Sequence, residues 1–149
     1  MAPPAAAPSQ HGCAIVLSAH GVVVVGPSGS GKSRLCQSLI ELWNRNQKFA
    51  RWVADDRVIF NLVSNQIEAR SPEPIQGMVE RRFAGIEKVT FQRRAIVDLV
   101  VELVAPHELD RLPDSPVHAP LPDGPKLPLI RVPFSNHNLA IELIAAKIT

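Results

Sequence analysis

The chain has 149 residues, of which 16 are Lys or Arg, 14 are Asp or Glu, and 46% are hydrophobic. A domain of this length can bury roughly 68–70% of the surface of its unfolded chain, so a core needs neither disulfides nor a structural metal. The net charge of +2 comes from scattered charges of both signs, which argues against a nucleic-acid partner. The apolar runs at residues 22–25 and 96–104 are far too short to span a membrane.

The N-terminal residues 1–10 are rich in Ala and Pro and lack the basic and apolar regions of a signal peptide. We interpret them as a disordered tail before a single domain at residues 11–149, and we expect a cytoplasmic protein. Cys13 and Cys36 are the only cysteines and form no CxxC pair. In a reducing compartment both are expected to be small buried hydrophobic residues.

Strand-like and helix-like patterns alternate over residues 12–63, which favours an α/β fold. Residues 13–17 predict a short strand, and the β-branched run 22–25 predicts a strand buried on both faces. The next apolar residues lie on one face of a helix that runs from Lys32 to about Asn44. These residues are Leu35, Leu39, Leu42 and Trp43.

A buried strand at residues 49–54 follows, and residues 58–63 and 67–70 predict a hairpin around the segment 64–66. Residues 75–85 have no clear period, and we interpret them as a loop or a short helix that carries functional groups. Residues 96–104 predict another strand.

The segment from 105 to 133 contains eight prolines, too many for a regular element, and we interpret it as a functional or mobile loop. The chain closes with a predicted helix over residues 138–148, with Leu139, Leu143 and Ile144 on one side. Ser135 or Asn136 could cap this helix.

A glycine-rich segment matches the pattern G-x-x-x-x-G-K-[ST] at every fixed position, between a buried strand and an amphipathic helix. Its three glycines allow successive N–H groups to turn toward phosphate oxygens at the positive end of the helix. Lys32 can reach the outer phosphates, and the Ser33 hydroxyl is placed to bind Mg²⁺. The alternative is a flexible Gly/Ser loop. The candidate nucleotide-binding residues are Gly26, Pro27, Ser28, Gly29, Ser30, Gly31, Lys32, Ser33 and Arg34.

Two carboxylates, Asp55 and Asp56, end the strand at residues 49–54, 22 residues after Ser33. If this strand is a parallel neighbour of residues 22–25, both carboxylates reach the phosphate-binding edge of the sheet. One could hold the metal, and the other could take a proton from an alcohol that attacks a terminal phosphoryl group. A cap at the strand exit is the alternative. Nothing resembles the Asn-Lys-x-Asp guanine motif, which disfavours a GTPase.

His11 and the cluster Glu80-Arg81-Arg82 say little about function when each is taken alone. An isolated histidine or a cluster of charged residues is usually just exposed to solvent. In combination and in this order, however, the motifs resemble the catalytic domain of the bacterial HPr kinase/phosphorylase family. The similar segments are His11-Gly12, the P-loop, residues 53–58 (VADDRV), and Glu80-Arg81-Arg82 with Gly85. Asn138-Leu139-Ala140 is also similar to the start of the family's C-terminal helix. The resemblance covers most of residues 11–148.

Members of this family phosphorylate a serine of the small phosphocarrier protein HPr with ATP, and reverse the reaction with inorganic phosphate to give pyrophosphate. The resemblance implies a P-loop α/β domain with a mixed central sheet, akin to phosphoenolpyruvate carboxykinases. It also implies ATP and Mg²⁺ as cofactors, with pyrophosphate or inorganic phosphate possible, HPr or an HPr-like protein as partner, and a homo-oligomer that is a hexamer in the family.

The resemblance also assigns roles to residues. Asp55 is implied as the general base that accepts the target serine's proton, and His11 and Arg82 as groups that stabilise the transferring phosphoryl group. Ser33 and Glu80 are implied as Mg²⁺ ligands, with Asp56 nearby. The catalytic residues implied are Asp55, His11, Lys32 and Arg82.

The chain departs from the family pattern at Arg34, where Glu is usual, and at Phe83, where Gly is usual. Residues 134–137 (FSNH) replace an arginine-bearing loop. These positions concern the phosphorylase direction, whereas the groups needed for kinase chemistry are all present. Ten residues precede His11 where typical members have a whole domain, which resembles a short form of the family. A small-molecule P-loop kinase and a non-catalytic nucleotide sensor remain as alternative functions.

Overall fold

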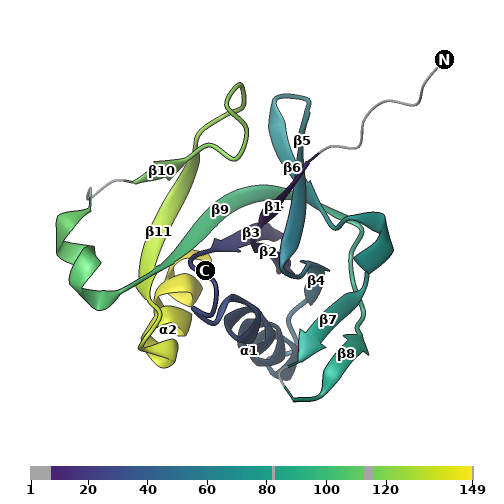
Figure 1. Ribbon diagram of the computed structural model, residues 1–149, viewed down its shortest axis with the longest axis horizontal. Helices are drawn as coiled ribbons and strands as arrows, with labels where there is room; N and C mark the ends of the chain where they lie inside the picture. Colours follow the sequence, from purple (N-terminus) through teal and green to yellow (C-terminus); the bar gives the residue numbers. More distant parts are fainter. Residues whose placement is uncertain (1–7, 82, 113–115, 149) are drawn as a thin grey trace.

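The computed structural model describes residues 8–81, 83–112 and 116–148. Within these residues a nine-stranded mixed sheet has the order β1-β5-β6-β9-β3-β2-β4, and β11 with its partner β10 also joins β9. A separate hairpin, β7-β8, flanks the sheet (Figure 1). Helices α1 and α2 both contribute to the hydrophobic cluster on one sheet face. This architecture confirms the predicted α/β class with a mixed central sheet.

The first part of the chain builds the centre of the sheet. Its elements are β1 (Ser9–His11), β2 (Cys13–Leu17), β3 (His20–Val25), α1 (Lys32–Arg45) and β4 (Ala50–Ala54). Side chains of β2 and β3 alternate between two clusters of buried residues, so both strands are covered on both faces. Helix α1 packs with Leu35, Leu39 and Trp43 among its buried residues. The predicted strands, and the helix to within one residue, are therefore confirmed.

One neighbour relation differs from the expectation. Strand β2 pairs antiparallel with β3 and also with β4, so the strand at residues 50–54 is not a direct neighbour of β3. The reason is the short turn between β2 and β3. It folds β2 back onto β3, so β2 occupies the side of β3 where β4 was expected. Since β2 is antiparallel to both strands, β3 and β4 still run in the same direction. Their carboxyl ends therefore lie at the same edge of the sheet.

The predicted hairpin is formed by β5 (Arg57–Val63) and β6 (Gln66–Arg70). Its two turn residues, Ser64 and Asn65, have positive φ angles of 50° and 62°, as a tight two-residue hairpin turn requires. Ser9 and Gln10 belonged to the predicted tail, but they form β1 with His11 and pair with β5. Unpaired backbone groups on the edge of β5 explain why this short segment is ordered.

The sequence suggested a loop or a short helix at residues 75–85, but the described part of this range (75–81 and 83–85) belongs mainly to a hairpin. A 3₁₀ turn (Glu73–Ile75) leads into the hairpin of β7 (Met78–Arg81) and β8 (Gly85–Lys88). In β7 only Val79 is buried, and all of β8 is exposed, so the segment lacks the alternating pattern that identifies a strand. Gly77 has φ 69°, and a Cβ there would lie 2.6 Å from the Phe91 ring.

The remaining elements are β9 (Arg94–Val104), a 3₁₀ segment (Pro106–Arg111), β10 (Val117–His118), β11 (Leu127–Pro133) and α2 (His137–Ile148). The prediction that residues 105–133 hold no regular element was wrong at its end, because β11 pairs parallel with β9. Prolines at both ends of β11 conceal the strand pattern.

Helix α2 is confirmed, and Asn136 caps it, since its Oδ1 accepts the Leu139 amide at 3.1 Å. The buried residues of α2 are Ala140 and Ile144, whereas Leu139 and Leu143, expected on the packed side, are 38% and 41% exposed. Of the three residues expected together on one side, Ile144 is buried as predicted, whereas the two leucines are not.

Candidate active site

The glycine-rich loop joins the end of β3 to the start of α1. Gly31 precedes the helix with φ 95°, no side chain in the described chain caps α1, and its first turn contains no acid. The first N–H groups of a helix need a partner, and they carry the positive end of the helix dipole. The start of α1 is therefore open to an anion such as a phosphate group.

Lys32 lies over this loop. Its Nζ donates to the carbonyl oxygens of Gly26 and Pro27, each at 3.1 Å. The Ser30 amide donates to the Pro27 carbonyl at 3.1 Å and closes a turn. The Ser30 hydroxyl oxygen is buried and has no hydrogen-bond partner among the described residues. The loop thus brings an ammonium group and an unused hydroxyl to the start of α1.

Asp55, at the end of β4, is 9% exposed and receives three donors. Its Oδ1 accepts the Ser33 hydroxyl at 2.5 Å and the Cys13 thiol at 3.4 Å. Its Oδ2 accepts the Glu80 amide at 3.1 Å. A carboxylate buried among hydrogen-bond donors keeps one orientation. Asp55 thereby connects the P-loop helix, strand β2 and the β7-β8 hairpin.

The other predicted residues have different positions. Asp56 is exposed with φ 68° and forms a tight turn, since the Arg57 amide donates to the Asp55 carbonyl at 2.8 Å. The Asp56 carbonyl accepts the Gly12 amide at 3.1 Å. This bond and the pairing of His11 with Arg57 bring the exposed His11 beside the two aspartates.

Glu80 is near the site through its backbone, because the N–H bound to Asp55 is its own, while the residue is exposed on β7. Arg82, predicted to steady the phosphoryl group, lies outside the described residues. Three described carboxylates were predicted for this site, those of Asp55, Asp56 and Glu80. Among them, the Asp55 side chain is the one that accepts a hydrogen bond from the P-loop serine, Ser33.

Cys13 is a residue that the sequence interpretation missed. It was expected to be an inert buried hydrophobic residue, but its thiol donates to Asp55 and lies 3.7 Å from the Ser33 hydroxyl. Cys36 is close by, and its burial, with Cys13 and Asp55 as further causes, raises the pKa of its thiol well above the ordinary value. The sequence signal was that Cys13 begins a strand at the edge that carries the P-loop.

The chain matches the protein family described as HPr Serine kinase C-terminal domain over residues 4–149. The chain belongs to this family. The HPr kinase/phosphorylase of Verminephrobacter eiseniae is 29% identical, and that of Leptothrix cholodnii is 31% identical, each over 93% of this chain. The chain spans about half the length of these curated relatives, 45% and 44% respectively.

A solved structure of the Hpr(Ser) kinase/phosphatase from Coxiella burnetii shares the fold of this HPr kinase family chain. Its TM-score is 0.76 at 24% identity, and the match covers 94% of this chain and 95% of that one. This match shows that the two chains share their fold.

The donor set suits Mg²⁺ better than a metal held entirely by protein. In the described ranges no three His, Cys, Asp or Glu side chains form a group that could hold a metal ion. Mg²⁺ at phosphate sites takes most of its ligands from phosphates and water and needs few protein oxygens. The Ser33 hydroxyl, which lies beside Asp55 at the start of α1, can supply one such oxygen in this family member.

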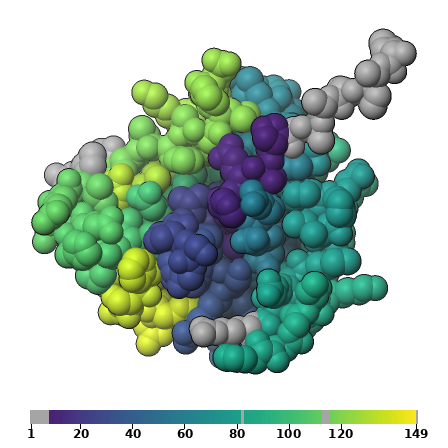
Figure 2. All heavy atoms as spheres, viewed as in Figure 1, coloured from purple at the N-terminus to yellow at the C-terminus, as the bar shows by residue number. Residues whose placement is uncertain are grey.

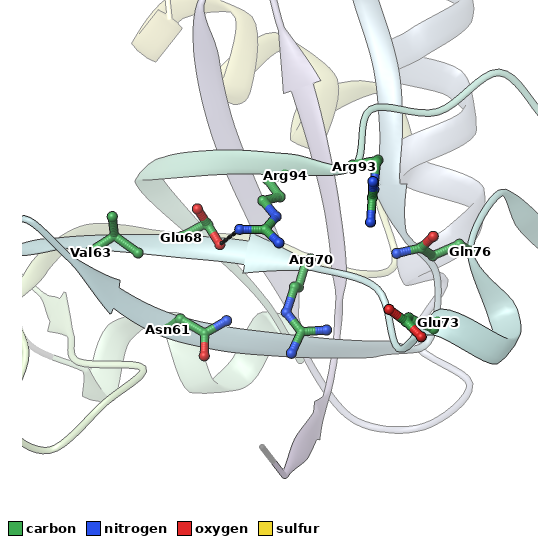
Figure 3. Close-up of a pocket in the computed structure, with 8 residues that line it drawn as sticks. All are labelled: Asn61, Val63, Glu68, Arg70, Glu73, Gln76, Arg93 and Arg94. Carbon is green, nitrogen blue, oxygen red and sulfur yellow. Dashed lines mark ion pairs between the residues drawn. The ribbon is translucent and has the colours of Figure 1, made fainter. Parts of the chain in front are cut away.

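A polar cavity lies away from the P-loop site. Its volume is about 330 Å³, and its lining includes Arg70, Arg93 and Arg94, with an ion pair of 3.6 Å between Arg94 and Glu68 (Figure 3). These residues surround the amino end of β9, whereas the P-loop follows the carboxyl end of β3, which runs parallel to β9. The cavity therefore takes no part in the P-loop site.

None of the described helices is long and apolar enough to cross a membrane.

Proposed function

We propose that this chain is the catalytic domain of an ATP-dependent protein kinase that phosphorylates a serine of HPr or an HPr-like phosphocarrier protein, with phosphorolysis as the reverse reaction. The observation that supports this most directly is the hydrogen bond from Ser33 to Asp55. It joins the phosphate-binding loop to a buried carboxylate where a phosphoryl group and a hydroxyl acceptor could meet. Membership of the family supports the choice of acceptor.

In this proposal the amides at the start of α1 and the Lys32 ammonium bind the phosphates of ATP. Ser33, with carboxylates of Asp56 and Glu80, holds Mg²⁺, which neutralises phosphate charge when bound. Asp55 accepts the proton of the acceptor serine as the serine oxygen forms its bond to the terminal phosphorus. The bond between that phosphorus and the bridging oxygen breaks, and ADP leaves.

In the reverse direction an oxygen of inorganic phosphate bonds to the phosphorus of phosphoserine, and the bond between that phosphorus and the serine oxygen breaks. The protonated Asp55 returns its proton to the serine oxygen, and pyrophosphate leaves. The position of Asp55 suits both directions of the reaction. Three hydrogen bonds hold its carboxylate in one place, where it can accept a proton in one direction and return it in the other. His11, beside the aspartates, and Arg82 are proposed to stabilise charge on the transferring phosphoryl group. We place this reaction in the cytoplasm, in a homo-oligomer such as a hexamer, with no nucleic-acid or membrane partner.

The deciding experiment is a transfer assay with ATP, Mg²⁺ and purified HPr-type proteins, in which mass spectrometry detects a modified serine. We expect Asp55→Asn to lower the transfer rate about 10²- to 10⁴-fold, because general-base catalysis contributes that much. ATP binding should survive, since Asn retains the size of the side chain. Asp123→Asn, the same change at an exposed loop residue, is the matched control.

Full transfer by Asp55→Asn would remove Asp55 as the base. ATP binding by the wild-type chain without transfer to any HPr-type protein or small hydroxyl acceptor would instead indicate a nucleotide sensor. Transfer to a small molecule alone would indicate a small-molecule kinase.

A further inference from the structure

A cavity distinct from the one at the amino end of β9 borders the P-loop, on the side away from Asp55. Its volume is about 240 Å³, and it lies between the start of α1 and the connection from β11 to α2. Figure 2 shows this neighbourhood from outside, where the dark blue P-loop region lies beside the yellow C-terminal helix. The residues that line the cavity include Ser30, Gly31, Arg34, Phe134 and His137.

The strand order explains why the two sides differ. Across the sheet the strands run β4, β2, β3, β9 and β11. The P-loop follows the central strand of these five. Asp55 follows β4, two strands to one side, and Phe134 follows β11, two strands to the other. A phosphate chain bound across the loop therefore has Asp55 beyond one end and the cavity beyond the other.

The side chains around this cavity have the composition of a site for a nucleobase and its sugar. Phe134 offers an aromatic ring that is 40% exposed. Arg34 provides a cation in the first turn of α1, and the imidazole of His137 is held by a 2.9 Å hydrogen bond between its Nε2 and the Ser38 hydroxyl. Small-ligand sites combine apolar or aromatic surface with a few placed polar groups.

The Ser30 hydroxyl gives independent support. Ser30 lines this cavity, and its hydroxyl oxygen is buried without a partner among the described residues, a condition that is rare in native structures. A ligand at this end of the loop could satisfy it. A cavity of about 240 Å³ is smaller than the 300–1,000 Å³ typical of whole drug-sized ligands, so it suits one part of a nucleotide rather than all of it.

We propose that this cavity binds the nucleoside of the phosphoryl donor, with the base against the Phe134 ring and Arg34 beside the phosphate nearest the sugar. The inference rests on the proposed function, since it takes the terminal phosphate to lie at the Asp55 end of the loop. It adds a specificity determinant: donors that carry a base use the cavity, and inorganic polyphosphates use the loop alone.

The test compares the affinities of two ligands, ATP and inorganic tripolyphosphate. Both are measured by calorimetry in the presence of Mg²⁺. Base-aromatic stacking is lost in Phe134→Ala, so the Kd for ATP should rise about fivefold or more. The Kd for tripolyphosphate should stay within about twofold, because that ligand has no base. Phe49→Ala is the matched control, since Phe49 is 47% exposed and lies next to Arg51 at the start of β4, far along the strand from Asp55.

Unchanged ATP affinity in Phe134→Ala, or an equal loss for both ligands, would overturn the proposal. A second measurement on the wild-type chain is independent of how the variant folds. Saturation of the Phe134 ring protons should transfer to the base protons of bound ATP in NMR spectra, and the absence of transfer would also overturn the proposal. Selective loss of ATP in Phe134→Ala, together with no phosphoryl transfer to any HPr-type protein, would keep the nucleoside site and remove the proposed kinase activity.

Discussion

The two sides of the P-loop differ in how their polar groups are satisfied. On the β4 side, three hydrogen bonds hold the buried Asp55 carboxylate, and they come from α1, β2 and β7. On the β11 side, a cavity of about 240 Å³ is lined by Ser30, whose buried hydroxyl has no partner among the described residues, and by Phe134, which is 40% exposed. Fixed geometry suits the place where a proton and a phosphoryl group move, and open space suits the part of a ligand that only binds.

The strongest test of this contrast replaces the two serines in turn. Ser33→Ala removes the donor at 2.5 Å from Asp55 Oδ1, and the loss of a hydrogen bond to a carboxylate should lower the free energy of unfolding by about 2 kcal/mol. Ser30→Ala removes a hydroxyl with no described partner, so the free energy should change by less than about 0.5 kcal/mol. Urea denaturation measures both.

Equal destabilisation by the two serine variants would contradict the contrast, because it would mean that the Ser33 bond contributes no more than an unpaired hydroxyl. The same atoms are removed in both cases, so the loss of side-chain size is alike. Only Ser33 lies in α1, where the higher helix propensity of alanine offsets part of the loss, so the measured destabilisation is a lower limit for the hydrogen bond. The m-values should match the wild type, which shows that the unfolded states are comparable.

The sequence predicted the β4 side of the loop better than the β11 side, for a physical reason. The P-loop and α1 follow from local patterns, and Asp55 follows from the rule that parallel strands end at one sheet edge. Phe134 reaches the loop only because β11 pairs with β9, a contact between distant segments that proline-rich residues 105–133 conceal. The β7-β8 hairpin, which supplies the Glu80 amide to Asp55, was missed because it has hardly any buried face.

Cys13 allows a smaller test on the β4 side. Cys13→Ala removes the thiol 3.4 Å from Asp55 Oδ1, and Cys13→Ser restores a donor of similar size. We expect the alanine variant to lose about 1 kcal/mol of unfolding free energy and the serine variant to recover most of it, since a neutral hydrogen bond contributes about that much. If the thiol positions Asp55, the transfer rate at saturating ATP should follow the same order.

Two outcomes would argue against a positioning role for Cys13. If alanine and serine destabilise equally, the thiol acts through packing rather than as a donor, because only serine retains a proton to share. If stability is recovered by serine but the transfer rate is not, the orientation of Asp55 does not depend on this bond. Thermal unfolding and transfer rates, measured on the same preparations, separate these cases.

The smallest expected effect is the pH dependence on the β11 side. Burial, and secondly the nearby Arg34 guanidinium, lower the pKa of His137 from its ordinary value of 6.5. The unfolded chain therefore takes up this proton at a higher pH than the folded chain does. The contribution of His137 to stability is fully present above pH 6.5, and it is lost as the pH falls from 6.5 to the lower folded pKa.

We expect His137→Gln to remove this loss, so the melting temperature of the wild type should fall more steeply than that of the variant below pH 6.5. His107→Gln, at an exposed histidine, is the control and should keep the wild-type profile. Arg34→Gln sharpens the test, because removal of the guanidinium should raise the pKa of His137 toward 6.5 and make the loss of stability smaller. Parallel pH profiles for the wild type and His137→Gln would contradict the lowered pKa of His137. Parallel profiles for the wild type and Arg34→Gln would show instead that the charge on Arg34 does not reach the imidazole.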